Sequence, residues 1–125
     1  MSQKGIDMPD TFQRDLLRGS LDLVVLSALV DEAKYGYLIQ NRVREVSQGR
    51  VDLKAGTLYP LLHRLEADKL IRCKWDDSTG RRRKWYALTA AGRKRLKVQA
   101  QQWHSYVECI GHLLSPVPPT VPRPA

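Results

Sequence analysis

Apolar residues recur at helical spacing in several stretches of the chain and alternate with polar residues in another. The clearest helical pattern spans residues 54–68, where leucines recur at i, i+3, i+4 and i+7 and mark one buried face of an amphipathic helix. These leucines are Leu58, Leu61, Leu62 and Leu65. The opposite face carries basic, aromatic and hydrogen-bonding side chains, which suit insertion into a DNA major groove. The alternative is an ordinary surface helix without a binding role, and the neighbouring stretches of sequence are needed to choose between the two interpretations.

Two further helices are predicted before this stretch. Apolar residues cover most sides of the segment 15–32, which predicts a central helix at the floor of the fold. Residues 37–47 predict a shorter helix, preceded by a turn at Gly36 and ended near Gly49. Its inward residues are expected to be Leu38, Ile39, Val43 and Val46. Two helices joined by a short glycine-containing turn, the second with a basic polar face, form a helix-turn-helix pattern.

Pro60 limits where the second helix of this pattern can begin. Proline lacks a backbone donor and crowds the carbonyl four residues back, here that of Gly56, and both effects are tolerated only near a helix N-terminus. The helix is therefore expected to begin between Lys54 and Gly56. Thr57 and Tyr59 then lie at its exposed N-terminal end, the end that usually meets base edges.

Two strands are predicted after the helix. Residues 70–76 alternate strictly, with Ile71, Cys73 and Trp75 on one side, and residues 83–88 are rich in aromatic side chains. The turn at 76–80 joins them into a β-hairpin, whose returning strand opens with four consecutive cations. Three helices followed by a hairpin predict a winged helix-turn-helix, in which the hairpin is the wing.

Thr89 is a suitable N-cap for a long last helix. An apolar residue recurs there every three or four positions over about three heptads, as in helices that pair like a coiled coil. These residues are Leu96, Ala100, Trp103, Val107, Ile110 and Leu114. The pattern extends past the winged domain, so the expected partner is a second subunit, through the same helix or through Leu17 and Leu21 of the first helix. Packing within one subunit is the alternative.

Together these elements predict a mainly α-helical fold with a small β-hairpin, a winged helix-turn-helix followed by a long C-terminal dimerisation helix. We expect the DNA-binding domain to span residues 13–88 and the dimerisation helix to span 89–114. Residues 1–12 are polar and aperiodic, which indicates a flexible arm. Residues 115–125 are rich in proline, which indicates an extended and flexible tail.

The charge is concentrated in one third of the chain. The net charge is +8, and residues 54–97 hold 13 Lys and Arg against 4 Asp and Glu. A basic excess confined to one region indicates a polyanionic partner, and nucleic acid is favoured over a membrane, although a non-specific nucleic-acid binder would share this excess.

No apolar run approaches the roughly 18 residues of a membrane span. The first residues lack a signal-peptide layout, and the two cysteines give no disulfide framework, so a cytoplasmic location is expected.

Four motifs in order resemble the PadR family of bacterial transcriptional regulators. They are LRGSLDLVVLSAL at 17–29, YGY at 35–37, GTLYPLLHRLE at 56–66 and GRRRKWYALTAAGRKRL at 80–96. The resemblance covers about residues 17–114, and the single C-terminal helix looks like the small subfamily. It implies a homodimer on a two-fold-symmetric operator, usually a repressor, and some members respond to small aromatic effectors. Lys69 stands where the family more often has glycine, so this turn either avoids positive φ or tolerates strain.

Candidate DNA contacts come from the recognition helix, the helix before it and the wing. From the recognition helix they are Lys54, Thr57, Tyr59, His63 and Arg64. Tyr59 is ambiguous, because its ring can pack inward while only its hydroxyl reaches a phosphate. Tyr35 and Tyr37 would add contacts with the DNA backbone. For Tyr37, a role in the hydrophobic core is an equally supported alternative. The wing cations are expected to reach phosphates or the minor groove, unless they are a solvated charge run; they are Arg81, Arg82, Arg83 and Lys84.

Other chemistry has weaker support. Trp103 rings from two subunits could sandwich a flat apolar effector near the dimer axis, with plain dimer packing as the alternative. Cys109 and His112 lie one turn apart with His104 further back, but this is no recognised zinc signature, so neither metal nor cofactor is expected. The sequence shows no Ser-His-Asp set, carboxylate pair or phosphate-binding glycine loop in a plausible context, which argues against an enzyme.

Overall fold

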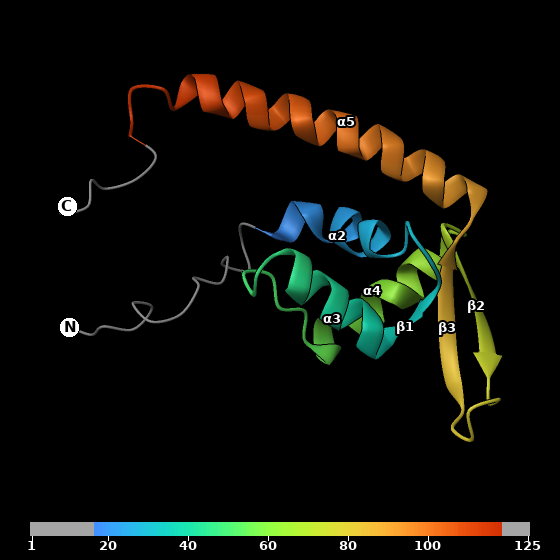
Figure 1. The fold of residues 1–125 in the computed structure, drawn as a ribbon. Coiled ribbons are helices and arrows are strands. Elements are labelled where there is room, and N and C mark those ends of the chain that lie inside the picture. Colours follow the sequence, from blue (N-terminus) through green and yellow to red (C-terminus); the bar gives the residue numbers. More distant parts are fainter. Residues whose placement is uncertain (1–16, 119–125) are drawn as a thin grey trace, which may run out of the picture.

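The computed structural model describes residues 17–118, with the side chain of Arg18 excepted. The predicted arm at 1–12 and most of the predicted tail at 115–125 lie outside this range. In chain order the elements are the 3-10 helix η1 (Arg18–Ser20), α2 (Leu21–Ala28), β1 (Lys34–Tyr35), α3 (Gly36–Val46), α4 (Ala55–Ala67), β2 (Ile71–Asp76), β3 (Arg83–Leu88) and α5 (Ala90–Leu113) (Figure 1). None of the described helices is long and apolar enough to cross a membrane.

The core lies where α2, α3 and α4 pack together and against the base of the sheet (Figure 1). The four leucines of α4 that the spacing predicted to face inward are all buried, so this prediction is confirmed. Leu26 of α2, Ile39 of α3 and Ile71 of β2 belong to the same buried cluster. Burying a side chain of this size contributes about 2 kcal/mol. This burial holds α4 with its polar side toward solvent.

The first helix is shorter than the predicted range of 15–32, because α2 ends at Ala28. The N–H group of Leu29 already donates to the carbonyl of Leu26, three residues back, at 3.1 Å. Apolar residues continue on all sides as far as Val30, so their spacing could not show where the helix stops.

Strand β1 was absent from the sequence prediction. Lys34 pairs with Tyr86 of β3, and Tyr35 pairs with Trp85, both in antiparallel register. Two residues are too few to show alternation. Lys34 is also buried despite its charge, because its ammonium group contacts the Asp31 carboxylate at 2.6 Å. The predicted hairpin is therefore part of a three-stranded antiparallel sheet with the order β1-β3-β2.

The helix-turn-helix largely follows its predicted boundaries. α4 begins at Ala55, within the predicted range of 54–56, and Pro60 lies in its second turn. The prediction of the α4 start is therefore confirmed. The inward orientation predicted for Val46 is wrong, since this side chain is 66% exposed at the end of α3. It borders an open groove together with Val24 and Val51.

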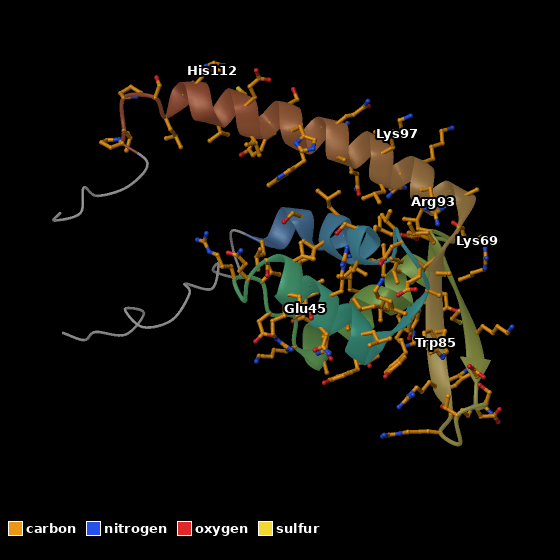
Figure 2. The ribbon with its side chains drawn as sticks, viewed as in Figure 1. Glu45, Lys69, Trp85, Arg93, Lys97 and His112 are labelled. Atoms are coloured by element: carbon orange, nitrogen blue, oxygen red, sulfur yellow. The ribbon has the colours of Figure 1, made fainter. Side chains whose placement is uncertain are left out.

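The turn between α4 and β2 contains Lys69, where the sequence left open whether the backbone avoids positive φ or tolerates strain. Lys69 has a φ of 62°, so the turn tolerates strain and does not avoid the left-handed region. Neighbouring hydrogen bonds hold this conformation: the Thr89 hydroxyl donates to the Lys69 carbonyl at 2.8 Å, and the Thr89 N–H donates to the Leu70 carbonyl at 3.1 Å. Figure 2 shows Lys69 at the base of the wing, close to the start of α5.

We expect Lys69→Gly to stabilise the protein by about 0.5–1 kcal/mol, because glycine adopts this φ without steric cost. The gain is smaller than the full steric relief, since glycine also makes the unfolded chain more flexible. Chemical denaturation monitored by circular dichroism measures the change. Lys69→Ala is the matched control, because it removes the side chain but keeps the strain. An equal gain in both variants would assign the effect to the lysine side chain.

Helix α5 is capped and seated at its N-terminus. The Thr89 hydroxyl accepts from the N–H group of Gly92 at 2.9 Å, so the predicted N-cap is confirmed. Gly92 is buried so tightly that a Cβ atom there would collide with the carbonyl oxygen of Leu70 and lie 3.2 Å from Leu88 Cδ2. From this anchor α5 crosses over α2, and its far end extends beyond the helical layer (Figure 1).

Candidate nucleic-acid interface

An open groove of about 840 Å³ lies between the start of α3, the α4 helix and the wing. It brings together eight of the eleven residues predicted to contact DNA. They are Tyr35, Tyr37, Tyr59, His63, Arg81, Arg82, Arg83 and Lys84. Gly36, Trp75 and Tyr86 complete the lining. In Figure 1 the first turns of α4 and the wing tip lie toward the bottom, on the side opposite α5. The groove and the predicted dimerisation helix therefore use different sides of the molecule.

Tyr59 packs across the first turn of α3. A Cβ atom at Gly36 would collide with the Tyr59 hydroxyl and lie 2.7 Å from Cζ of the ring, so only glycine admits this contact. The tyrosine is nevertheless 41% exposed on its groove side. The central glycine of the YGY motif thus serves a residue that lies 23 positions later in the chain. Spacing alone could not show this pairing.

The tyrosines on either side of Gly36 occupy different environments. Tyr37 is 59% exposed, so the core role considered for it is wrong. Tyr35 is half-buried and packs edge-on against Trp85, with ring centroids 5.0 Å apart. The guanidinium carbon of Arg83 lies 4.5 Å from the centre of the Tyr35 ring. Tyr35 therefore connects the start of α3 to the wing.

The four wing cations are not equivalent. Arg82 stacks over Trp75 at 4.6 Å, and Arg83 stacks over Tyr35. Lys84 is half-buried, and its ammonium group lies 3.4 Å from a carboxylate oxygen of Glu66. Arg81 is exposed at the edge of the groove. A freely solvated run does not describe this arrangement, because three of the four side chains are held by specific neighbours.

Glu66 of α4 ties the wing to the helix. Its carboxylate accepts a hydrogen bond from the Cys73 thiol at 2.8 Å and faces Lys84 on the adjacent strand. The hydrogen bond from Cys73, aided by the charge of Lys84, lowers the pKa of Glu66. The same hydrogen bond, together with burial, raises the pKa of the Cys73 thiol. Glu66 is therefore charged, and Cys73 is a neutral hydrogen-bond donor. The sequence pattern predicted only that Cys73 lies on the same side of its strand as Ile71 and Trp75.

A raised pKa leaves less Cys73 as thiolate, the form that reacts with disulfide reagents. We expect Cys73 in Cys109→Ser protein to react with such a reagent more slowly at pH 8 than Cys109 does in Cys73→Ser protein. Glu66→Gln should accelerate the Cys73 reaction, because it removes the negative charge that disfavours the thiolate. Absorbance of the released thiol measures both rates. Equal reactivity of Cys73 before and after Glu66→Gln would contradict the assigned cause.

The other three candidates lie outside the groove. Arg64 forms two hydrogen bonds with the Asp22 carboxylate of α2, at 2.7 and 3.1 Å, and this contact raises the pKa of Arg64. Arg64 lies about 100° around α4 from His63, so it is directed toward α2 instead. Lys54 contacts Asp52 at 2.9 Å near the start of α4. The last of the three, Thr57, is half-buried.

The eight residues predicted for a dimer interface fall into two groups. Three of them pack against the core of their own subunit: Leu17, Leu21 and Leu96. The others lie further along α5, where Trp103, Val107 and Leu114 are exposed and Ala100 and Ile110 are half-buried. Trp103 lies beside Tyr106, with ring centroids 5.8 Å apart, and both border a pocket of about 240 Å³ against Gly19 and Leu23. Within residues 17–118 no cluster of three potential metal-ligating side chains is present.

Trp75 is a groove residue that the sequence prediction did not select. It shares a strand face with Ile71 and Cys73, as the alternation indicated. Ile71 lies at the buried base of the wing, whereas Trp75 lies near the tip and is 51% exposed. A tryptophan directly before the turn that leads to the cations was the available signal.

The fold and this groove define a winged helix-turn-helix protein with a cationic, aromatic surface between its recognition helix and its wing. Residues 25–98 match the Transcriptional regulator PadR-like family. The chain therefore belongs to the PadR-like family, whose members are DNA-binding transcriptional regulators.

Individual relatives agree with this assignment. A transcriptional regulator of Mycobacterium tuberculosis is 36% identical over 83 residues, which make up 66% of this chain and 75% of that protein. The structure of a transcriptional regulator from Clostridium thermocellum superposes with a TM-score of 0.73 at 31% identity, covering 78% of this chain and 96% of that one. A PadR family regulator from Eggerthella lenta gives a TM-score of 0.69 at 35% identity, covering 80% and 86%.

Proposed function

We propose that this regulator is a repressor that binds a two-fold-symmetric operator as a homodimer. The observation that carries the proposal is the groove, in which aromatic and cationic side chains from α3, α4 and the wing face one open surface. Phosphates are bound by cations and base edges by hydrogen-bonding side chains, and the groove offers both. An active repressor would place α4 over a promoter and exclude the transcription machinery.

Within this interface the elements have different roles. Thr57 and His63 on α4 are proposed to read base edges, because they lie on the helix that enters the major groove. Contacts with the DNA phosphate backbone next to these bases are proposed for Lys54, Tyr35 and Tyr37. The wing arginines are proposed to reach phosphates or the minor groove, where negative potential favours arginine. Arg64 would join them only by leaving Asp22, so we give it a positioning role for α4.

The dimer is proposed to form through α5. Val107 and Leu114 are exposed apolar side chains along the last part of α5. Trp103 adds a partly exposed ring closer to α2 of its own subunit. Covering this surface with the same helix of a second copy removes it from water and supplies the seam that the heptad spacing predicts. Such a pair would set the two α4 helices about 34 Å apart, one turn of DNA. Sedimentation of wild type and Val107→Glu tests this assembly.

Gel shifts with the DNA upstream of the protein's own gene, at physiological salt and with competitor DNA, test operator binding. A specific repressor gives a saturable complex that random competitor does not displace. A non-specific nucleic-acid binder, the alternative function, loses the complex in proportion to competitor mass. Complete competition by random duplex would therefore contradict operator recognition.

A small aromatic effector is proposed to release the DNA through Trp103. The support is the pocket that Trp103 and Tyr106 border between α2 and α5, a position next to the proposed dimer contact. Planar aromatic compounds should quench the tryptophan fluorescence of the wild type, and Trp103→Leu should abolish the quenching. If no such compound quenches, Trp103 has only a packing role in the dimer.

A further inference from the structure

The most unusual groove residue is Trp75, a large aromatic side chain left half-exposed on a strand at the edge of the sheet. It lies outside the buried core cluster, so its packing does not account for its presence. On the opposite strand Lys84 is its direct partner in the antiparallel register. Arg82 directly precedes β3, and its guanidinium lies over the Trp75 ring, as the Lys84 ammonium group does.

The two cations use the Trp75 ring differently. Lys84 lies 5.9 Å from the ring centre and is already paired with Glu66. Arg82 lies closer, at 4.6 Å, and no acidic side chain pairs with it among the described residues. A guanidinium that rests on an aromatic face keeps its in-plane N–H groups free for a phosphate. Arg82 thus has its charge available and its position restricted.

We propose that Trp75 is a positioning residue for DNA binding, which acts by holding Arg82 in place to contact a backbone phosphate. This inference rests on the proposed DNA-binding function of the groove. A free arginine loses much of its side-chain freedom when it binds, whereas an arginine already held on a ring loses less. Removing the ring therefore weakens binding through Arg82 although the charge remains.

The wing contains an internal control for this mechanism. Arg81 carries the same charge at the same tip, is exposed, and has no ring contact among those found in the described residues. Arg83 rests on Tyr35, a ring from a different element. Trp75 should therefore be coupled to Arg82 and independent of Arg81.

A double-mutant cycle tests the proposal, with binding to a mixed-sequence duplex of about 30 base pairs measured by fluorescence anisotropy at several salt concentrations. In the wild type, Arg82→Ala should lower affinity about thirtyfold at 0.15 M salt, the loss of one phosphate contact in each subunit of a dimer. In Trp75→Ala protein the same substitution should cost only a few-fold. Trp75→Tyr should retain most of the coupling, because tyrosine also offers a ring.

Arg81→Ala is the matched control and should cost the same with and without Trp75. The half-exposed ring is not part of the core, so Trp75→Ala should also leave the thermal unfolding temperature almost unchanged. If Arg82→Ala costs the same in both backgrounds, the positioning role is wrong while DNA binding stands. If the wild type binds no duplex at low salt, the proposed function fails and this inference fails with it.

Discussion

Replacing Gly92 with alanine is expected to destabilise the fold by about 2–3 kcal/mol, the cost of overpacking a rigid site. The added methyl group would collide with the Leu70 carbonyl oxygen. This carbonyl cannot move freely, because it accepts a hydrogen bond from the Thr89 N–H at 3.1 Å and belongs to a buried residue. The thermal midpoint should fall by about 10–20 °C for a domain of this size.

Gly111→Ala in the same helix is the matched control, because a Cβ atom there meets nothing within 4 Å. This substitution should stabilise α5 by up to about 1 kcal/mol, since alanine is the better helix former. Unfolding in urea monitored by circular dichroism compares the two variants. Equal stability of Gly92→Ala and wild type would show that the junction between α5 and the wing is looser than the contacts indicate.

The second large expected effect is the loss of DNA affinity as the salt concentration rises. The proposed dimer would make about eight phosphate contacts, so its affinity for the proposed operator should fall some thousandfold for a threefold rise in salt concentration. The triple variant R81A/R82A/R83A should bind every sequence more weakly, and the slope of log affinity against log salt should fall from about 7 to about 2. This variant keeps the Lys84–Glu66 contact, so the wing stays attached to α4. Anisotropy titrations at four salt concentrations measure the slope.

Two control variants distinguish the effect of the wing cations from that of cations elsewhere on the protein and from the recognition of base edges. The variant K94A/R95A/K97A removes the same number of cations from exposed positions of α5, the helix that lies on the opposite side of the fold from the wing tip (Figure 1). It should leave the slope nearly unchanged. His63→Ala should alter which sequences are preferred while the slope remains. Salt-independent binding by the wild type would exclude the electrostatic account of the wing.

The residue pattern was most reliable where one element determined the outcome. Leucines at helical spacing identified the buried face of α4, and Pro60 located the start of that helix, because both signals act within a few residues. The Thr89 cap could also be predicted, since its partner Gly92 is only three residues away. The extent of the first helix and the exposure of Val46 were predicted wrongly, because each depends on where neighbouring elements end.

The candidate interface shows the same division. The sequence concentrated the cations in the wing and polar groups on α4, and eight of the predicted contacts do line one groove. It could not show that Arg64 faces Asp22, 42 residues earlier, or that Tyr59 needs the glycine at position 36. Periodicity tells which side of an element faces the core, but not which side chain of another element lies beside it.

The sequence by itself therefore determined the order of the helices and of the two wing strands, the inward face of the recognition helix, the position of the basic wing and membership in the PadR-like family. These properties depend on local spacing and composition. Only the tertiary structure decided that the wing is part of a three-stranded sheet and that its cations have separate partners. The reason is physical: strand β1, Glu66 and Trp75 reach their partners only after the chain has folded back on itself.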